Sequence, residues 1–274
     1  MTELFTVFGA DGFVGRRLVQ RLTSEGHHVQ AVGRNDRLDA YFSDLGNVMY
    51  CVGVTGSRFK TEQFRVVDAH VSSMARVLEH GRFSSFLYMS SARMYEESIT
   101  DSTESARFGV VPSNISDFYN LSKLMGESLL MNSGVANARI VRVSYAVDFA
   151  EDSTDNLTEF IRSARRGEVN FLAHPDSTKD YIVMGDILDV MPRIALSGTA
   201  SLYNVASGMN TSTREIGGVL AEETGCEVTY LAEEALRSPK QIDIGLLKSE
   251  FSFKPQSVLD YARRVLRSEN CRER

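Results

Sequence analysis

The sequence predicts an α/β protein in which helices cover a parallel, doubly wound sheet. Two observations carry this prediction. Short apolar runs alternate with segments of helical periodicity along the first half of the chain, and the first apolar run ends in a glycine-rich turn that opens a helix. With 274 residues, of which 43% are hydrophobic and 24% charged, the chain can bury a sizeable core.

The first three predicted elements have the order and length of a βαβ unit. Leu4–Gly9 is a short apolar run, residues 13–26 have apolar side chains at helical spacing, and His27–Gly33 is the second strand. Only residues 34–46 separate this strand from the next apolar run. Because that connection is too short for a helix and a strand, the edge strand usual at this position is predicted to be missing.

The alternation continues as far as Ser144. Further buried strands are predicted at Asn47–Val54, Ser84–Ser91 and Ala138–Ser144. Long helices separate them at residues 61–81 and 116–134, the second with Ser116 or Asp117 as its N-cap. Beyond these elements the pattern loosens into shorter strands and helices, which we expect to form a smaller C-terminal region.

Composition excludes several classes of function. A net charge of −6 argues against nucleic acid bound through bulk charge, and no apolar run is long enough to span a bilayer. The cysteines lack disulfide or zinc spacing, so we interpret them as free thiols: Cys51, Cys226 and Cys271. We therefore expect a cytoplasmic protein with no metal site and no membrane or nucleic-acid partner.

The turn after the first strand has the spacing of a dinucleotide-binding fingerprint. Gly9 permits the tight turn, Gly12 lets the backbone approach a pyrophosphate, and Gly15 allows the helix to pack closely on the strand. The free N–H groups at the start of this helix, at Phe13 and Val14, would face the phosphates. The alternative is a glycine-rich turn without a ligand.

The end of the second predicted strand favours NADP(H) as the cofactor, with NAD(H) as the alternative. NAD enzymes usually carry Asp or Glu there to bind the ribose hydroxyls, whereas this chain has Gly33 followed by Arg34. The planar guanidinium of Arg34 could pair with a 2′-phosphate. The competing interpretation is that Arg34 is a solvated loop residue.

A tyrosine and a lysine lie four residues apart on the helix predicted at 116–134. Tyr119 and Lys123 would then share one face of the helix, about one turn apart. The ammonium group would favour the phenolate of a tyrosine, whose ordinary pKa of about 10 is too high for a good base at neutral pH. Alternatively, both side chains could simply cover apolar surface.

Together, the glycine motif, the strand end "YMSSARMY" and Tyr119-x-x-x-Lys123 resemble the extended short-chain dehydrogenase/reductase family, the NAD-dependent epimerase/dehydratase group that acts on nucleotide sugars. The segments "KDYIVMGDILDV", "SLYNVASGMNTSTREIGGVL" and "SEFSFKP" extend this similarity over nearly the whole chain. The resemblance implies a Rossmann-type dinucleotide-binding domain and a substrate-binding region. We expect these at residues 1–148 plus 180–206 and residues 149–179 plus 207–274, respectively.

The resemblance also implies roles for individual residues. Tyr119 would exchange a proton with a sugar hydroxyl or keto oxygen, Lys123 would also bind the nicotinamide ribose, and Ser91 would hydrogen-bond the same substrate oxygen. Further substrate-binding candidates are Arg93, Tyr145, Lys179 and Arg237. The last two would bind a diphosphate, although each could instead be a solvated surface charge.

Departures from the family pattern narrow the reaction. Family dehydratases carry Asp-Glu directly after the catalytic hydroxyl, where this chain has Ala92 and Arg93, so dehydration is disfavoured. His70 stands where Asn is common, either as a substrate-side acid or as a satisfied helix residue. The resemblance implies an NADP(H)-dependent oxidoreductase of a nucleotide-activated sugar, first of all a keto-sugar reductase. The alternatives are a nucleotide-sugar epimerase with tightly bound NAD and a non-catalytic dinucleotide-binding regulator.

A homodimer is the expected oligomeric state. In proteins that this chain resembles, the helices predicted here at Glu62–His80 and Asp117–Asn132 pair with their symmetry mates. Both are apolar on more than one side, with helical rows of Val67, Val71, Met74, Leu78, Leu121, Met125 and Leu129. The competing explanation is that C-terminal segments cover these rows within one chain.

Overall fold

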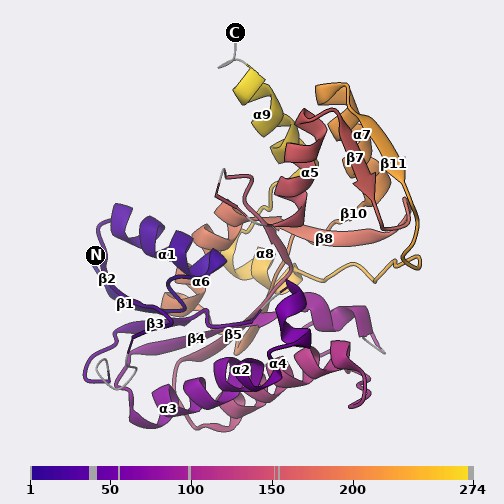
Figure 1. Cartoon of the computed structure of the whole chain (residues 1–274). Coiled ribbons are helices and arrows are strands. Elements are labelled where there is room, and N and C mark those ends of the chain that lie inside the picture. Colours follow the sequence, from indigo (N-terminus) through magenta and orange to yellow (C-terminus); the bar gives the residue numbers. More distant parts are fainter. Residues whose placement is uncertain are drawn as a thin grey trace.

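The computed structural model describes residues 2–36, 42–54, 56–97, 100–150, 152–153 and 155–270. Its centre is a six-stranded parallel sheet with strand order β2-β1-β3-β4-β5-β9. The strands are β1 (Leu4–Phe8), β2 (His28–Val32), β3 (Asn47–Tyr50), β4 (Ser85–Ser91), β5 (Ala138–Val143) and β9 (Leu202–Val205). The predicted α/β fold with a doubly wound parallel sheet is confirmed (Figure 1).

Strand β2 is an edge of this sheet, which agrees with the short connection that follows it. Among the described residues no strand pairs with the outer side of β2. Residues 37–41 of the connection lie outside the described part of the chain.

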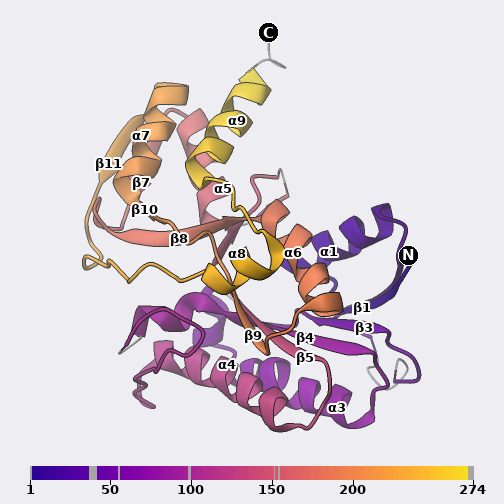
Figure 2. The ribbon, with the colours of Figure 1, turned by 180° about the vertical axis from the view of Figure 1, so that it is seen from behind.

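Helices cover both faces of the sheet (Figures 1 and 2). On one face lie α1 (Phe13–Ser24) and α6 (Met184–Ser197), which bury Leu18, Leu22, Val190 and Ile194 in a common core with the sheet. On the other face lie α3 (Ser73–His80) and α4 (Ile115–Asn132), which bury Met74, Val77 and Leu130 against Tyr50 and Tyr88. Two apolar layers therefore enclose the strands.

The helix predicted at residues 61–81 contains a π turn. It begins as α2 (Gln63–Val67), widens into the π segment η3 (Asp68–Ser72) and continues as α3. All three keep the right-handed helical conformation where they join. Such single π turns are often found at functional sites, and this one turns the buried His70 towards α4.

The N-cap predicted for α4 is wrong. Asn114 caps the helix, since its side-chain oxygen accepts a hydrogen bond from the N–H of Ser116 at 2.9 Å. Asp117 instead lies inside the first turn, where its carboxylate accepts a hydrogen bond from the N–H of Val111 at 2.9 Å. The carboxylate thus holds the preceding loop rather than the helix terminus.

The C-terminal half forms a smaller unit beside the main sheet (Figure 1). Its sheets comprise β6 (Tyr145–Val147), β8 (Thr178–Val183) and β10 (Asn210–Ser212), and the parallel pair β7 (Glu168–Phe171) and β11 (Glu227–Tyr230). Its helices are α5 (Asn156–Arg165), α7 (Thr213–Thr224) and α9 (Val258–Asn270). Helix α8 (Gly245–Phe251) returns to the main sheet and packs on β9. The exact residue ranges predicted for two domains stay a prediction.

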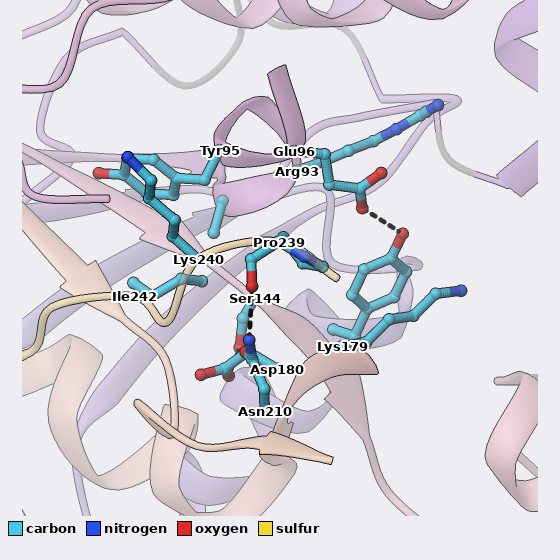
Figure 3. Close-up of a pocket in the computed structure, with 12 residues that line it drawn as sticks. Arg93, Tyr95, Glu96, Ser144, Lys179, Asp180, Asn210, Pro239, Lys240 and Ile242 are labelled. Carbon is cyan, nitrogen blue, oxygen red and sulfur yellow. Dashed lines mark hydrogen bonds between the residues drawn. The ribbon is translucent and has the colours of Figure 1, made fainter. Parts of the chain in front are cut away.

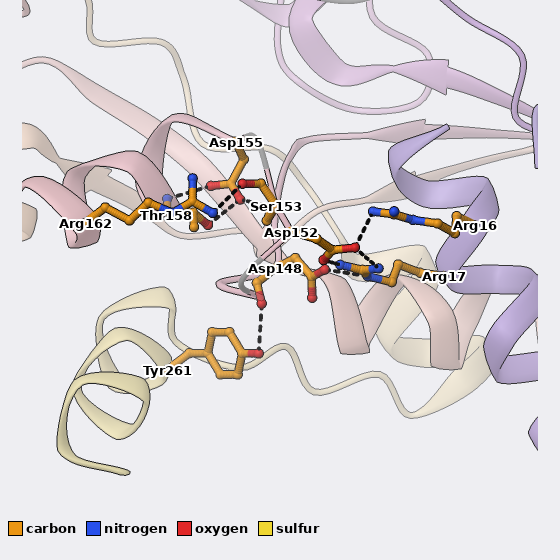
Figure 4. Close-up of polar contacts among 9 residues, drawn as sticks. All are labelled: Arg16, Arg17, Asp148, Asp152, Ser153, Asp155, Thr158, Arg162 and Tyr261. Atoms are coloured by element: carbon orange, nitrogen blue, oxygen red, sulfur yellow. Dashed lines mark hydrogen bonds and ion pairs between the residues drawn. The ribbon is translucent and has the colours of Figure 1, made fainter. Parts of the chain in front are cut away.

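Charged contacts tie α1 to the segment that follows β6 (Figure 4). The Nε of Arg17 donates to Asp148 at 2.6 Å, and its guanidinium also pairs with Asp152. Arg16 pairs with the same Asp152 at 2.8 Å. The main-chain oxygen of Asp148 accepts a hydrogen bond from the hydroxyl of Tyr261 in α9 at 3.3 Å.

Two further expectations concern the whole chain. Across the described residues, none of the helices has the length and apolarity needed to cross a membrane. Cys51 and Cys226 are buried free thiols, as predicted, and Cys271 lies outside the described residues.

Candidate active site

The glycine turn has the shape that a pyrophosphate requires. Gly9 has a φ of +81°, and a side chain at Gly15 would place its Cβ 2.2 Å from the oxygen of Gly9. Arg16 is the first residue of α1 whose N–H bonds back into the turn, to the oxygen of Gly12 at 3.0 Å. The N–H groups before it, including those of Phe13 and Val14, precede the helical ladder and can meet a ligand.

The end of β2 carries two carboxylates that the sequence did not single out. Oδ2 of Asp11 accepts a hydrogen bond from the N–H of Arg34 at 3.0 Å, and Oδ2 of Asp36 accepts one from the N–H of Gly33 at 2.7 Å. A side chain at position 33 would place its Cβ 2.4 Å from Oδ2 of Asp11. Asp11 was visible inside the glycine motif, but its approach to Gly33 depends on how two loops fold together.

Arg34 lies beside other charged groups. Glu62 has a lowered pKa, chiefly because Arg58 hydrogen-bonds its carboxylate, and the positive charges of Arg65 and Arg34 contribute. The positive charge of Arg34 therefore adds to the field that favours the ionised form of Glu62.

Ser91 and Tyr119 meet at the carboxyl end of the sheet. Ser91 is the last residue of β4 and Tyr119 comes from α4, and the Ser91 hydroxyl lies near enough to Tyr119 to favour its phenolate. Tyr119 is only 6% exposed, and its ring packs on those of Phe59 and His70 at centroid distances of 5.4 and 5.5 Å. Burial raises the pKa of Tyr119, while the Ser91 hydroxyl and the charge of Arg93 oppose that rise.

Lys123 lies one turn along α4 from Tyr119, with its ammonium group buried. Nζ donates a hydrogen bond to the main-chain oxygen of Met89 at 2.9 Å and lies 5.1 Å from the centre of the Tyr88 ring. Burial lowers the pKa of Lys123 to about 8, so the ammonium form still predominates at neutral pH. A Cβ at Gly53 would lie 3.8 Å from this Nζ, so the loop after β3 passes beside the lysine.

His70 is neutral and fully hydrogen-bonded. Its Nε2 accepts from the N–H of Val54 at 3.4 Å, so Nδ1 carries the proton and donates to the hydroxyl of Ser122 at 2.8 Å. Ser122 in turn donates to the main-chain oxygen of Tyr119 at 2.7 Å. Burial, together with the charge of Lys123, lowers the pKa of His70 to about 2. Of the two interpretations of His70, the geometry supports a satisfied helix residue.

A pocket opens between the 3₁₀ segment η4 (Ala92–Glu97), which follows Ser91 in the chain, and β6, β8 and residues 239–242 (Figure 3). Three predicted substrate residues line it: Arg93, Tyr145 and Lys179. Nζ of Lys179 lies 4.8 Å from the centre of the Tyr145 ring. The pocket is also lined by Glu96, Asp180, Asn210 and Lys240, which the sequence did not single out.

Another predicted substrate residue, Arg237, lines an adjoining polar pocket. Arg93 and Glu96 border both pockets, and Glu96 joins them by pairing with Arg237 at 3.4 Å and accepting from the hydroxyl of Tyr145 at 3.1 Å. Asn120 also lines the polar pocket, and in the described part of the chain its buried Oδ1 has no hydrogen-bond partner.

Arg93 links the pocket to the Tyr119–Ser91 pair. Its guanidinium carbon lies 4.8 Å from the centre of the Phe59 ring and 5.5 Å from that of Tyr119. Its main-chain N–H donates to Oγ of Ser91 at 3.2 Å. Arg93, which occupies the position of Glu in family dehydratases, thus supplies a positive charge beside Tyr119.

Comparison with solved structures shows the same fold over nearly the whole chain. MoeE5 in complex with UDP-glucose and NAD shares 18% identity and a TM-score of 0.77, covering 98% of this chain and 99% of its own. UDP-glucose 4-epimerase of Thermotoga maritima with UDP-glucose shares 16% identity and a TM-score of 0.82, at 98% and 99% coverage. RMD from Pseudomonas aeruginosa complexed with NADPH shares 19% identity and a TM-score of 0.77, at 97% and 98% coverage.

A search of curated proteins finds no match. The model of the NAD-dependent epimerase/dehydratase family, however, matches residues 5–206, which include the glycine turn, Ser91, Tyr119 and Lys123. The chain therefore belongs to the NAD-dependent epimerase/dehydratase family.

Proposed function

We propose that this protein is an oxidoreductase of a nucleotide-activated sugar, with a nicotinamide dinucleotide as cofactor and Tyr119 as the group that moves the proton. The observation that carries the proposal is the approach of the Ser91 hydroxyl at the end of β4 to the buried Tyr119, with Lys123 one helical turn along α4. Residues at this strand end and on this helix face fit an alcohol–ketone conversion.

The bound dinucleotide would supply or accept the hydride at the substrate carbon. In the direction of reduction, the Tyr119 hydroxyl gives its proton to the carbonyl oxygen, and the C–O double bond becomes a C–O single bond. Ser91 holds that oxygen by a hydrogen bond. Tyr119 is left as a phenolate, which the reverse reaction uses as the base.

The positive charges around Tyr119 are needed because burial works against the phenolate. Burial raises the pKa of Tyr119 above its ordinary value. The guanidinium of Arg93 offsets this by favouring the negatively charged form, and we assign the same effect to the ammonium of Lys123 one turn along the helix. The glycine turn and the start of α1 would hold the pyrophosphate of the cofactor.

A nucleotide sugar is the proposed substrate class. Two similar structures contain UDP-glucose, and the pocket between η4, β6 and β8 offers Lys179 and Lys240 as cations for a diphosphate. Arg237 borders the adjoining pocket and would have to leave Glu96 to join them.

Two net reactions suit this site. Reduction of a keto sugar is the first, because Ala92 and Arg93 replace the pair that dehydratases use for elimination. Epimerisation is the second. The observation that favours it is the pair of carboxylates Asp11 and Asp36 beside the cofactor turn, because carboxylates at this place suit the ribose hydroxyls of NAD, the cofactor expected for an epimerase. An epimerase must regenerate its cofactor in each cycle and therefore keeps it bound.

Two measurements test the proposal. The purified protein is denatured and any released nucleotide identified by mass: retained NAD indicates an epimerase, whereas an empty site that binds a reduced dinucleotide indicates a reductase. Turnover of a panel of nucleotide sugars is then followed by absorbance of the reduced nicotinamide or by product analysis.

On the substrate so identified, Tyr119→Phe is expected to lose roughly 10²- to 10⁴-fold in turnover while keeping its cofactor affinity. Tyr230→Phe, which removes a hydroxyl in β11 that makes only a 3.5 Å contact with the main-chain oxygen of Arg214, is the matched control. Undiminished turnover of Tyr119→Phe would contradict the assignment of Tyr119. Failure of the wild-type protein to bind any dinucleotide would contradict the whole proposal.

A further inference from the structure

We infer that the polar pocket next to the proposed active site receives a carboxylate of the substrate, which makes the substrate a nucleotide-activated acidic sugar. The pocket is lined by Arg93, Glu96, Asn114, Ser116, Asn120 and Arg237. This inference rests on the proposed function and deepens it by naming the class of sugar. It depends on two polar groups in the pocket wall that the described residues leave unpaired.

Arg93 provides the first unpaired group. Its guanidinium carbon lies 4.8 Å from the centre of the Phe59 ring and 5.5 Å from that of Tyr119. The residue is half-buried, and within the described ranges no carboxylate pairs with its guanidinium and no oxygen accepts a hydrogen bond from it. The aromatic contacts leave the N–H edges of this planar group free to donate. Because a half-buried charge without a counter-charge is costly, Arg93 favours an anionic ligand.

Asn120 provides the second unpaired group. It follows Tyr119 on α4 and is 3% exposed, and its Oδ1 has no hydrogen-bond partner in the part of the chain that the structure describes. Buried polar side chains are nearly always hydrogen-bonded, so an unpaired amide in a pocket wall indicates a ligand. A sugar hydroxyl can both donate and accept, so it satisfies the amide whichever way the amide is turned.

The acidic group in the pocket wall is already paired. Of the residues that line the pocket, only Glu96 is acidic. Its carboxylate accepts a hydrogen bond from the hydroxyl of Tyr145 at 3.1 Å (Figure 3). It also pairs with Arg237 at 3.4 Å, which offsets the charge of that arginine. The charge left over in the pocket wall is therefore the single positive charge of Arg93.

The start of α4 adds no further net charge. Asn114 and Ser116 bring the N-terminus of this helix to the pocket, and a helix N-terminus carries a partial positive charge. Asp117 lies in the first turn, where it is 3% exposed, and its negative charge balances this end of the helix. The pocket therefore matches a ligand group that carries one negative charge.

A carboxylate suits these groups better than a phosphate. The planar fork of Arg93 can donate to both oxygens of a carboxylate, and one charge balances the other. A phosphate monoester carries a charge of about −1.5 to −2 at neutral pH and would also need Arg237, which Glu96 holds. Because Arg93 also lies beside Tyr119, the carboxylate must be attached close to the carbon whose oxygen Tyr119 serves. Acidic sugars, which carry a carboxylate next to ring hydroxyls, have this arrangement.

The test is a binding titration with matched pairs of nucleotide sugars, followed by calorimetry with and without added NAD or NADP. UDP-glucuronic acid and UDP-glucose form the first pair, and dTDP-linked and GDP-linked pairs follow. The two members of each pair differ only in carrying a carboxylate or a CH₂OH group at C6. Binding is measured rather than turnover, because Arg93 also supports the phenolate of Tyr119.

The wild-type protein is expected to bind the acidic member of a pair at least tenfold more tightly than the neutral member, a difference typical of one charge-assisted contact. Arg93→Gln should remove this preference. Arg93→Lys, which keeps the charge but not the planar fork, should retain part of it. Asn120→Ala should weaken the binding of both members several-fold, because both carry ring hydroxyls.

The matched control is Arg82→Gln. Arg82 is exposed and precedes β4, so it lies at the opposite end of this strand from Ser91. Its replacement removes the same charge and should leave both affinities unchanged. Thermal melts verify that each variant is folded.

Equal affinity for the two members of every pair, or an unchanged preference in folded Arg93→Gln, would overturn this inference and leave the proposed oxidoreductase intact. Unchanged affinities in folded Asn120→Ala would overturn the role of Asn120. If the wild-type protein binds none of the nucleotide sugars, the proposed function fails and this inference fails with it. The two failures are therefore distinguishable in one experiment.

Discussion

Glu127 and Arg142 form a buried ion pair one helical turn beyond Lys123. Arg142 donates to both oxygens of the carboxylate, at 3.0 and 2.7 Å, and the two side chains are only 4% and 5% exposed. The hydroxyl of Ser90 donates to the same carboxylate at 2.5 Å, and Arg142 also donates to the Tyr95 hydroxyl at 2.9 Å. Residues of β4, α4, β5 and η4 thus share one polar network beneath the proposed active site.

Breaking this pair on one side should be costly. Glu127→Gln leaves the guanidinium of Arg142 buried without a counter-charge, so we expect a loss of about 3–5 kcal/mol in the free energy of unfolding, measured by urea denaturation. The double variant Glu127→Leu with Arg142→Met removes both charges and should recover most of this loss. Equal stability of the single and double variants would show that the buried charge of Arg142 costs little without its partner.

The burial of Lys123 predicts that the free energy of unfolding depends on pH above pH 8. In the folded chain its pKa is lowered from 10.5 to about 8, so between these values the unfolded chain binds a proton that the folded chain does not. Folding therefore becomes more favourable as the pH rises from 8 to 10.5. Relative to Lys123→Met, the wild-type protein should gain roughly 3 kcal/mol over this range in chemical denaturation. Parallel stability curves for the two proteins would refute the shift.

The lowered pKa of His70 predicts a loss of folding stability at acid pH. Its pKa is about 2 in the folded chain and 6.5 in the unfolded one, so only the unfolded chain takes up a proton as the pH falls below 6.5. The contribution of His70 to stability is complete above pH 6.5 and is lost below it, by about 1.4 kcal/mol per pH unit. We expect His70→Asn to flatten the acid limb of the stability profile. If the stability of His70→Asn falls with decreasing pH as steeply as that of the wild-type protein, other groups determine the acid sensitivity.

The outer face of the paired helices predicts a homodimer. Phe64 is 93% exposed, and Met125, Met131 and Val67 are 58%, 50% and 42% exposed, whereas Met74 is fully buried in the chain's own core. Large apolar side chains exposed on neighbouring helices are typical of an interface. We expect sedimentation at micromolar concentration to give twice the chain mass of 30.5 kDa.

Phe64→Glu with Met125→Glu should convert this dimer to a monomer, while Leu236→Glu, at a residue 58% exposed in the C-terminal half, serves as the control. A wild-type species at the chain mass with no concentration dependence would exclude the dimer. Only part of the apolar rows seen in the sequence needs a partner, because Met74, Leu78 and Leu129 pack within the chain.

The features that could be predicted from the sequence have local signals. The glycine turn, the helix that carries Tyr119 and Lys123, and the apolar strands are each encoded within about twenty residues, and the short connection at residues 34–46 is a matter of chain length. Periodicity and spacing are sufficient for such elements.

The features that could not be predicted depend on contacts between distant segments. Asp11 meets Gly33 across two loops, and Asn120 lacks a hydrogen-bond partner only because of what packs around α4. The π turn at Asp68–Ser72 leaves the apolar pattern of its helix nearly unchanged, so periodicity does not reveal it. Asn114 replaces the expected N-cap because Asp117 turns back to bind Val111.

The contacts around Arg17 constrain any motion of the smaller unit relative to α1 (Figure 4). Arg17 binds Asp148, and the main chain of Asp148 is also held by Tyr261, so α1 and α9 meet at one residue. A swinging motion that preserves these contacts must have its axis near Asp148. Ion pairs at a partly open surface weaken as salt is added. We therefore expect higher ionic strength to weaken the link between α1 and the smaller unit and to speed ligand exchange.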